Sequence, residues 1–589
     1  MSLKPTPITS VSAAPPGRRL ESWKEIAAYL GRDVTTVRRW EKREGLPVHR
    51  LQHSKLGSIY AYTTELDAWR DKTAPAVTTD VGDRDPAAEA DRQRLYRHRV
   101  AALVALTLLL ALGVTWLIRE RGTGAASANG VIRSLVVLPM QNFSGNPEQD
   151  YLSDGMTEAL IARLATIHGL RVISRTSAMQ FKGTRKSVPE IGKELNVDAI
   201  IEGSVLRAGD KIRVTVQLIR ADTDEHIWAD TYDRELRDIL VLQSDVTQGI
   251  AGHIETAVVG TQTGSSVIPR TVAPEVYDAY LKGRFALHKN SRAGLEEALV
   301  RFQVAVDGDA TFAPAYAGLA ATHDALGLVF YGVPPGEARP KALVAARKAL
   351  QLDPELAEAR VLLANTLQKE WHWTEAEAEY KRAIELSPSN AGAHAGLAQW
   401  LLCQGRTEEA LAWARRAQEL DPLAYRGVEV GWILFQSRRY DEAIRELQSA
   451  LTMEPEDPMA GWFLGFALIG AGRFDEAIHA LEKTASLADQ NSAVLGVLVH
   501  AYAHGGRRVE AMRVLNELHQ RRQRGYVPPA AFLNAYLGLG DTEEAFAWME
   551  HCAEERSNIL QFLKVHPFMD PIRSDPRFAA YLRRANLSP

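Results

Sequence analysis

The longest uncharged apolar run in the chain covers residues 100–118, VAALVALTLLLALGVTWLI. Nineteen residues at a rise of about 1.5 Å each span roughly the hydrocarbon core of a bilayer. Trp116 lies where an interfacial aromatic residue is expected. The alternative is a buried core helix, which would usually carry a polar stripe, and this run offers only two threonines. The pattern predicts one transmembrane helix.

Arginine residues flank this run unequally. Four precede it and three follow it, the latter offset by Glu120: Arg92, Arg94, Arg97 and Arg99, then Arg119, Arg121 and Arg133. This bias predicts a cytoplasmic amino-terminal side and places everything after residue 118 outside the cytoplasm. Polar segments at 73–99 and 119–131 have linker composition. Residues 1–17 lack an apolar stretch, so we expect a disordered leader and no cleavable signal peptide.

Residues 132–258 alternate between strand and helix patterns. The run SLVVLPM predicts a buried strand, and residues 150–167 carry apolar residues at helical spacing. LRVISR then predicts a strand and VPEIGKELNV a helix, before three strands in residues 198–234. The turn AGD joins the first two of these strands in a hairpin. An α/β domain is therefore expected.

One series in this domain could suggest metal binding or acid–base chemistry. Asp150, Asp154 and Glu158 recur every four residues and line one helix face. A solvated acidic stripe is the commoner cause of such spacing, and we expect one here. His226 is expected to be a strand residue without a catalytic partner. No catalytic site is predicted.

Residues 270–589 read as helices rich in Ala, Leu and Glu. Pro354, Pro388, Pro422 and Pro455 are 34, 34 and 33 residues apart, and Asp489 continues the series at 34. A small residue, a larger or small residue and a second small residue precede each breaker at constant offsets, as with Ala376, Tyr380 and Ala383 before Pro388. Helix caps also recur, with a glycine ending one helix and Thr407 or Asp475 starting the next. A generic helical bundle would not keep this register.

These features closely resemble the tetratricopeptide-repeat family over about half of the chain. The resemblance implies a superhelix whose concave face binds proteins or peptides. Four tryptophans are candidates to line such a groove, although aromatic residues in these helices more often pack between repeats: Trp371, Trp373, Trp400 and Trp432.

Residues 18–72 predict a small domain with two short helices. Ser22 and Glu25 have the spacing of a capping box, and Gly31 ends the first helix. Asp33 starts a second helix that Gly45 ends. Residues 53–57 look like a hairpin tip, followed by a strand and a short helix containing Leu66 and Trp69. Two helices joined by a tight turn indicate a helix-turn-helix, and the hairpin adds a wing.

Positive charge concentrates in this domain. Residues 32–55 hold seven Lys/Arg against three acids, which suits phosphate contact. The domain resembles the winged helix-turn-helix of the MerR and excisionase families. That resemblance implies base-edge contacts from Thr35, Thr36 and Arg39, and phosphate contacts from Arg38, Lys42, Arg43 and Lys55. The alternative to DNA binding is a solvated basic helix in a protein-binding module.

The middle domain resembles the amino-terminal α/β domain of TolB-like envelope proteins, by pattern rather than by a chemical motif. The whole order of parts is similar to one-component membrane regulators of the CadC and ToxR type. Their winged helices belong to a different subclass from the one indicated here.

Composition changes this picture little. The formal net charge is only −4, and the two cysteines, Cys403 and Cys552, lie far apart and suit core positions rather than a disulfide or a metal site. No phosphate loop, zinc pattern or nucleophile elbow is present in the sequence, so we expect neither an enzyme nor a cofactor.

The sequence thus predicts a multidomain, single-pass inner-membrane regulator that binds DNA in the cytoplasm and senses a signal or protein outside it. Expected partners are duplex DNA, proteins or peptides at the repeats, the membrane and a second copy of the chain. The alternative is an envelope scaffold whose amino-terminal helices bind a protein rather than DNA.

Overall fold

The computed structural model describes residues 17–50, 59–73, 131–255, 271–289, 291–328, 331, 333–423 and 427–588. Apart from single terminal residues, the expected leader, both linkers and the transmembrane helix at 100–118 lie outside this part of the chain, as does the hairpin tip with Lys55. Among the residues described, none of the helices has both the length and the apolar character needed to cross a bilayer. The chain forms two compact units, Met1–Ala125 and Ala126–Pro589.

The first unit contains three helices and a small antiparallel sheet with strand order β1-β3-β2. Its elements are β1 (Arg19–Leu20), α1 (Trp23–Leu30), α2 (Val34–Glu44), β2 (His49–Arg50), β3 (Ile59–Tyr62) and α3 (Thr63–Thr73). Ile26, Val37 and Leu66 are fully buried, so one residue from each helix meets in the core. The two predicted amino-terminal helices are confirmed at their predicted boundaries.

Local polar contacts explain where these two helices begin and end. The Ser22 hydroxyl accepts a hydrogen bond from the Glu25 amide at 3.2 Å, as a cap should. The Glu25 carboxylate, however, accepts from the amide of Glu21 at 2.8 Å, so the predicted capping box forms with a shifted partner. Gly31 ends α1 in the left-handed region, with φ of 63°. Asp33 then caps α2 directly.

The second unit begins with the α/β domain. Its strands are β4 (Ser134–Val137), β5 (Gln141–Asn142), β6 (Arg171–Val172), β7 (Ala199–Ala208), β8 (Lys211–Arg220) and β9 (His226–Glu235). Its helices are η1 (Pro147–Gln149), α5 (Asp150–Leu164), α6 (Arg175–Met179), α7 (Val188–Leu195), η2 (Leu236–Asp238) and α8 (Ile239–Glu255). The predicted α/β domain is confirmed, including the hairpin between β7 and β8.

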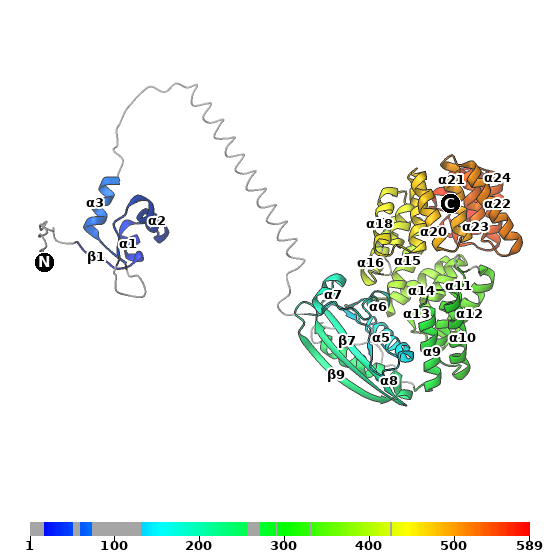
Figure 1. The fold of residues 1–589 in the computed structure, drawn as a ribbon, viewed down its shortest axis with the longest axis horizontal. Helices are drawn as coiled ribbons and strands as arrows, with labels where there is room; N and C mark the ends of the chain where they lie inside the picture. The colour runs from blue at the N-terminus through cyan, green and yellow to red at the C-terminus, as the bar shows by residue number, and fades with distance from the viewer. Residues whose placement is uncertain are drawn as a thin grey trace, which may run out of the picture. The chain divides into compact units, whose positions relative to one another are not determined.

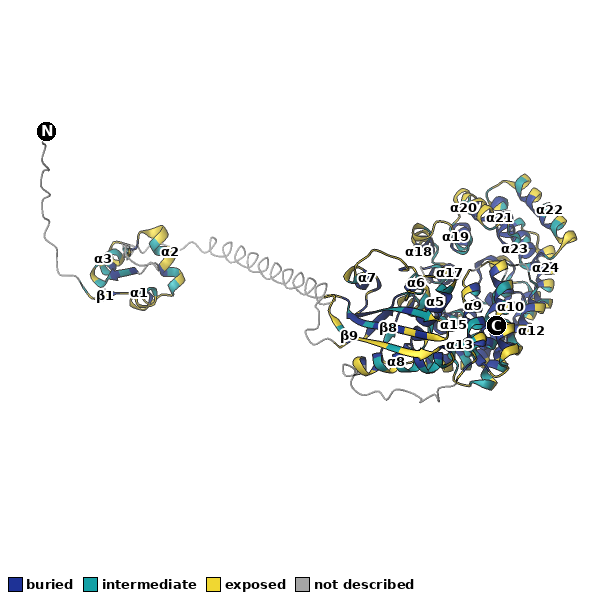
Figure 2. Ribbon diagram, turned by 60° about the horizontal axis from the view of Figure 1, so that its bottom comes forward, coloured by how far each residue is buried: buried dark blue, intermediate teal, exposed yellow. Residues whose placement is uncertain are grey.

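The sheet is mixed, with order β6-β4-β7-β8-β9 and β5 paired to β7. β4 runs parallel to β6 and β7, whereas β7, β8 and β9 are antiparallel. α5 packs on β4, β5 and β7, and α8 packs on β9 and on α5. The outer strand β9 is largely exposed, whereas β8 alternates between buried and exposed positions (Figure 2).

Sixteen described helices then follow as antiparallel pairs, which confirms the predicted tetratricopeptide-repeat superhelix (Figure 1). They are α9 (Pro274–Leu287), α10 (Arg292–Gly308), α11 (Ala313–Leu326), α12 (Pro335–Leu352), α13 (Ala357–Lys369), α14 (Trp373–Leu386), α15 (Ala391–Cys403), α16 (Thr407–Leu420), α17 (Val428–Gln436), α18 (Tyr440–Met453), α19 (Pro458–Gly470), α20 (Phe474–Leu487), α21 (Ser492–His504), α22 (Arg508–Arg524), α23 (Pro529–Leu539) and α24 (Thr542–Glu554). The chain ends with η3 (Asn558–Phe562), η4 (Pro567–Ile572) and α25 (Pro576–Arg584).

Close helix crossings explain the small residues of the repeat pattern. Phe302 on α10 is fully buried, and its ring fills the space over Gly283 of α9 and Gly318 of α11. A Cβ at these glycines would lie 2.7 Å and 2.4 Å from that ring. A larger residue at either position would therefore have to displace the ring.

Thr407 starts α16 as predicted, whereas α20 starts at Phe474 rather than at Asp475, and neither Thr407 nor Asp475 is the helix cap. The cap positions are Arg406 and Arg473, whose side chains accept no hydrogen bond from the helix amides. Each arginine instead forms a two-bond ion pair with the glutamate three residues on, at 2.6 and 2.7 Å for Arg406 and Glu409. The acidic first turn follows from this pairing and from the helix dipole.

Replacing Phe302 by alanine should lower the free energy of unfolding of the second unit by about 3–5 kcal/mol, because a fully buried ring leaves a cavity. Denaturant titration measures the change. Val304→Ala, on the same helix but 51% exposed, should change stability by less than about 0.5 kcal/mol. Equal effects of the two variants would contradict the packing described here.

Candidate functional site

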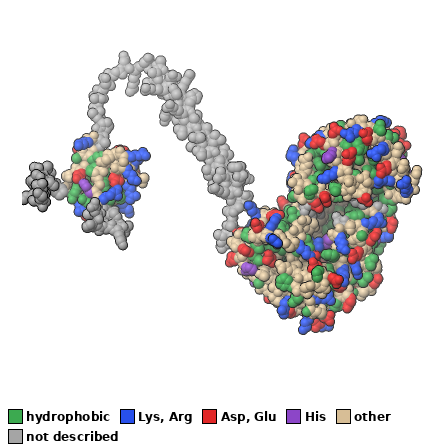
Figure 3. All heavy atoms as spheres, viewed as in Figure 1, with side chains coloured by type: hydrophobic (Ala, Val, Ile, Leu, Met, Phe, Trp, Pro, Cys, Tyr) green, Lys and Arg blue, Asp and Glu red, His purple; other side chains and the backbone are tan. Residues whose placement is uncertain are grey.

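Helix α2 presents most of the residues that the sequence predicted for DNA contact. Thr35, Arg38, Arg39, Lys42 and Arg43 are exposed. On the opposite side, Val37 is buried, and Val34 and Trp40 pack partly buried against the core, as predicted. Trp40 also contacts Trp69 of α3, with ring centroids 5.4 Å apart. Figure 3 shows Lys and Arg side chains gathered on the flank of this unit that carries α2.

Two of these residues are already engaged. The Thr36 hydroxyl donates to the Asp33 carboxylate at 2.6 Å, and this hydrogen bond lowers the pKa of Asp33. The Arg38 guanidinium lies over the Trp23 ring at 5.3 Å, at the margin of the exposed side. Within the described part of the chain, Arg39, Lys42 and Arg43 form no ion pair. These three cations are therefore available to a polyanion.

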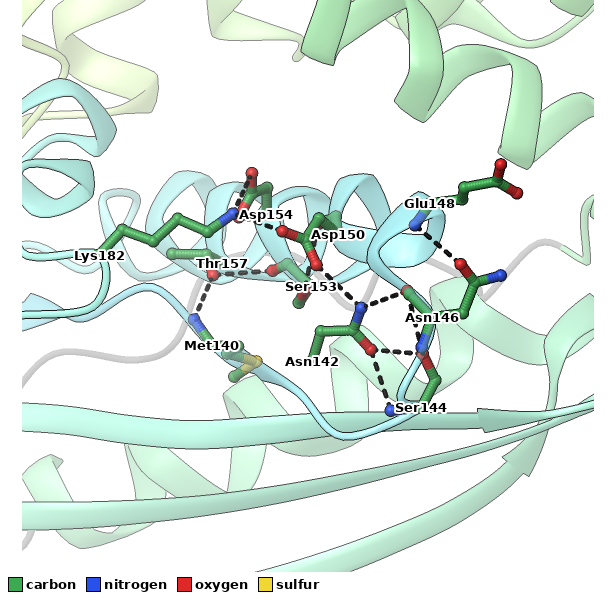
Figure 4. Close-up of polar contacts among 10 residues, drawn as sticks. All are labelled: Met140, Asn142, Ser144, Asn146, Glu148, Asp150, Ser153, Asp154, Thr157 and Lys182. Atoms are coloured by element: carbon green, nitrogen blue, oxygen red, sulfur yellow. Dashed lines mark hydrogen bonds and ion pairs between the residues drawn. The ribbon is translucent and has the colours of Figure 1, made fainter.

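The acidic series on α5 is not a solvated stripe, and that prediction is wrong. Asp154 is only 3% exposed. Its carboxylate binds the Lys182 ammonium at 2.7 Å, and Asp150 lies 3.5 Å from the same ammonium (Figure 4). The reason is that the repeats and the segment after β6 cover this face of α5, which a sequence pattern cannot show.

Glu158, one turn further along α5, lies at the contact between the α/β domain and the repeats. It pairs with Arg284 of α9, and Arg175 and His288 lie 3.4 and 3.6 Å away. Arg284 also binds Glu358 of α13 at 2.6 Å. Burial would raise the pKa of Glu158, but the surrounding cations outweigh it and hold that pKa far below its usual range.

Close backbone packing accompanies this cluster. A Cβ on Gly155 would lie 2.4 Å from the Leu281 side chain of α9, so α5 and α9 approach more closely than a larger residue would allow. Tyr151 donates a hydrogen bond to Asp278, also on α9. The side of α5 that carries Tyr151, Gly155 and Glu158 is therefore the contact face for the first repeat.

Loops of later repeats form a second contact with the α/β domain. The Ser389 hydroxyl donates to the Leu170 carbonyl at 2.8 Å, and the Ser177 hydroxyl donates to Asp421 at 2.5 Å. Both partners from the repeats stand next to the breaker prolines Pro388 and Pro422. Sequence analysis missed these residues, and only their position beside the breakers could have marked them.

The loop before α5 is held by its own polar groups, as Figure 4 shows. The Asn142 amide donates to Asp150 at 2.9 Å, and its oxygen accepts from the Ser144 hydroxyl at 2.6 Å. A cavity of about 450 Å³ lies beside this loop, lined among others by Arg207 and Lys282. Both cations face Asp278, so their charge is largely met within the protein. No cluster of potential metal ligands occurs in the residues described.

The four tryptophans considered for a groove are between 4% and 7% exposed, so they pack inside the molecule. Trp400, for example, donates its indole hydrogen to the Trp373 carbonyl at 2.8 Å. Cys403 and Cys552 are free and buried, as predicted, and burial raises the pKa of both thiols.

Comparison with protein families identifies two parts of the chain. Residues 132–248 match the family described as HilA/YgeH-like transcriptional regulator, second domain. Residues 361–425, 434–484 and 468–527 match tetratricopeptide-repeat families. These matches support a transcriptional regulator that carries a protein-interaction domain.

Individual proteins resemble shorter stretches. A Rhizobium meliloti (strain 1021) protein with the provisional name adenylate cyclase 3 is 36% identical over 186 residues, which is 32% of this chain and 32% of that protein. The chain thus matches about a third of that relative. Yeast Tom70 is 18% identical over 55% of this chain and 70% of its own, with a TM-score of 0.35. YrrB, a repeat protein with an unusual peptide-binding site, is 21% identical over 36% of this chain and all of its own, with a TM-score of 0.24.

Replacing Glu158 by glutamine should lower the free energy of unfolding at pH 7 by about 3 kcal/mol, because it leaves buried cations without their partner. Since the folded-state pKa of Glu158 is depressed, its stabilising effect is present above the ordinary value of about 4.3 and is lost as pH falls below it. Denaturant titrations at pH 7 and pH 4 should therefore show the gap between the two proteins shrinking. Glu409→Gln, which breaks only an exposed pair, should cost less than about 1 kcal/mol, and a similar loss from both changes would count against a special role for Glu158.

Proposed function

We propose that this protein is a membrane-anchored, one-component transcriptional regulator. The first unit binds duplex DNA in the cytoplasm, and residues 131–588 receive a signal or a protein partner beyond the inner membrane. The observation that carries the proposal is the exposed basic side of α2, where Arg39, Lys42 and Arg43 stand without ion-pair partners among the described residues.

The shape of the first unit supports DNA recognition. Two helices joined through the left-handed Gly31, followed by the strands β2 and β3, have the order of a winged helix-turn-helix. In that arrangement α2 enters the major groove. Arg39 and Thr35 then face base edges, while Arg38, Lys42 and Arg43 contact phosphates. The Thr36 hydroxyl donates its hydrogen to Asp33, so toward a base Thr36 offers its methyl group or its hydroxyl oxygen as an acceptor, but not a donor. Lys55 would add a phosphate contact from the wing.

The membrane part of the proposal rests on residues 100–118 and on the arginine bias around them. DNA is cytoplasmic, so a single span places the α/β domain and the repeats on the other side. One helix has no channel, so a signal has to cross as a change in association between two copies of the chain. The family match of residues 132–248 to a regulator domain agrees with this role.

The proposal includes no catalytic step. The relative named as a cyclase matches over only a third of its length, so its activity is not transferred to this chain. The alternative remains an envelope scaffold whose first unit binds a protein, and DNA binding separates the two functions.

Residues 1–99 should bind duplex DNA, with the logarithm of the affinity falling linearly with the logarithm of salt concentration. Lys42→Ala should weaken binding and reduce the salt slope by about 0.9, the value for one lost phosphate contact. Fluorescence anisotropy with labelled duplexes across a salt series measures both. Arg70→Ala removes a charge of the same sign from α3, where Asp67 already pairs with it, and should leave the slope unchanged. Absence of saturable binding would favour the scaffold.

The ends of the protein should lie on opposite sides of the inner membrane. An alkaline phosphatase reporter, which is active only outside the cytoplasm, should be active when fused after residue 589 and inactive when fused before residue 90. Replacing Leu108 and Leu110 by arginine should release the protein from membranes, because charges at the centre of a span are costly. Matching reporter activity at both positions would disprove the single-span topology.

A further inference from the structure

The last part of the chain departs from the repeat pattern. Residues 555–588, here called the C-terminal segment, form η3, η4 and α25 rather than another long helical pair. Eleven of its apolar side chains are less than 10% exposed: Leu560, Phe562, Leu563, Val565, Phe568, Met569, Ile572, Phe578, Leu582, Ala585 and Leu587. They belong to the same hydrophobic core as the repeats.

This segment runs along the first helices of successive repeats. Phe562 packs on Trp432 of α17 with ring centroids 5.5 Å apart. Phe568 packs on Phe466 of α19 at 5.1 Å and stacks on His500 of α21 at 4.0 Å. Because one short segment touches the first helices of consecutive repeats, it lies along the inner face of the superhelix, the face that such proteins ordinarily use for ligands.

Arginine side chains of the repeats hold the segment at the start of η3 and within η4. Arg339 of α12, only 4% exposed, donates to the Arg556 carbonyl at 2.8 Å and to the Asn558 side chain at 2.7 Å. Arg438 forms a two-bond ion pair with Asp570, at 2.6 and 2.7 Å. These contacts fix the register of the segment on the inner face.

Helix α25 then joins distant repeats. Arg577 binds Glu543 of α24 at 2.9 Å. At the other side, the Trp373 indole, where α14 begins, donates to the Ala585 carbonyl at 2.7 Å. The segment therefore ties the last repeat to the repeat formed by α13 and α14, and it closes the superhelix on itself.

We infer that the C-terminal segment is a permanent occupant of the inner face between α13 and α24, so that this stretch of the repeats does not take up an extended peptide from a partner. Release of the segment would expose eleven buried apolar side chains together with the repeat residues that pack on them. We therefore expect loss of the segment to destabilise the repeats that it contacts. This inference does not require the first unit to bind DNA.

The contact is also insensitive to mild acidification. Burial lowers the pKa of His500, and of His566 beside it, to about 3. Both imidazoles are therefore neutral at the pH of either compartment. Arg438, Arg573, the ring of Phe568 and the imidazole of His504, which stacks on His500 at 4.7 Å, surround them, and the described carboxylate close to this group is Asp570, which Arg438 and Arg573 hold.

Hydrogen exchange on the full-length protein in detergent micelles tests the inference. Amides of residues 560–572 should exchange within about 10-fold of the rates in α19 and α21, as members of one cooperative unit. A fluorescein-labelled peptide of residues 555–575, added to the same protein, should show no saturable binding. Exchange more than about 100-fold faster in the segment than in α19, or saturable peptide binding, would overturn the inference and mark the inner face as open to partners.

Variants test whether the C-terminal segment opens only together with the repeats or can open by itself. In the full chain, Phe568→Ala should speed exchange in α17, α19 and α21 together with the segment. Asp570→Asn, which keeps the apolar packing, provides a milder test and should act in the same direction. Val509→Ala on the outer face, where the side chain is 82% exposed, should leave the pattern unchanged. Faster exchange confined to residues 560–572 in both variants would show that the segment is an independent, releasable element.

Discussion

The contact between α5 and the first repeat determines how the larger unit is organised. Glu158 brings together cations from α6 and α9, and Arg284 extends the cluster to α13. Buried charges are stabilising only when their partners are held in place, because only the attraction between them offsets the free-energy cost of removing each charge from water. The α/β domain and the repeats are therefore parts of one compact unit rather than two modules on a tether.

The joining of the α/β domain and the repeats in one compact unit limits how a signal can be transmitted. A ligand or partner that binds the repeats acts on a body that already includes the α/β domain, so no flexible joint between them needs to transmit the change. The C-terminal segment adds to this rigidity, because it ties α24 to the α13–α14 repeat. In the regulator proposed here, a signal received by this unit would change how two copies of the chain associate. The residues between the two units would transmit that change to the proposed DNA-binding unit.

Local features of this protein follow from its sequence, whereas contacts between distant residues do not. The helices around Gly31 and Gly45, the hairpin at Gly209 and the repeats marked by Pro388 and Pro422 were all placed correctly, because each depends on a few neighbouring residues. The carboxylates of α5 were misjudged. Their spacing is the same for a solvated stripe and for a buried contact face, and the deciding partners, Lys182 and Arg284, lie 28 and 126 residues away from them.

By itself the sequence determined the order of the described domains, the basic surface of α2 and the 34-residue period of the repeats. Those properties follow from composition and from periods that a helix or strand imposes on its own side chains. Only the tertiary structure decided that α5 is enclosed, that the groove tryptophans are internal and that residues 555–588 cover the inner face. Each of these facts depends on which surfaces pack together. A surface becomes buried only when a partner surface covers it, so the local sequence of either segment does not determine its burial.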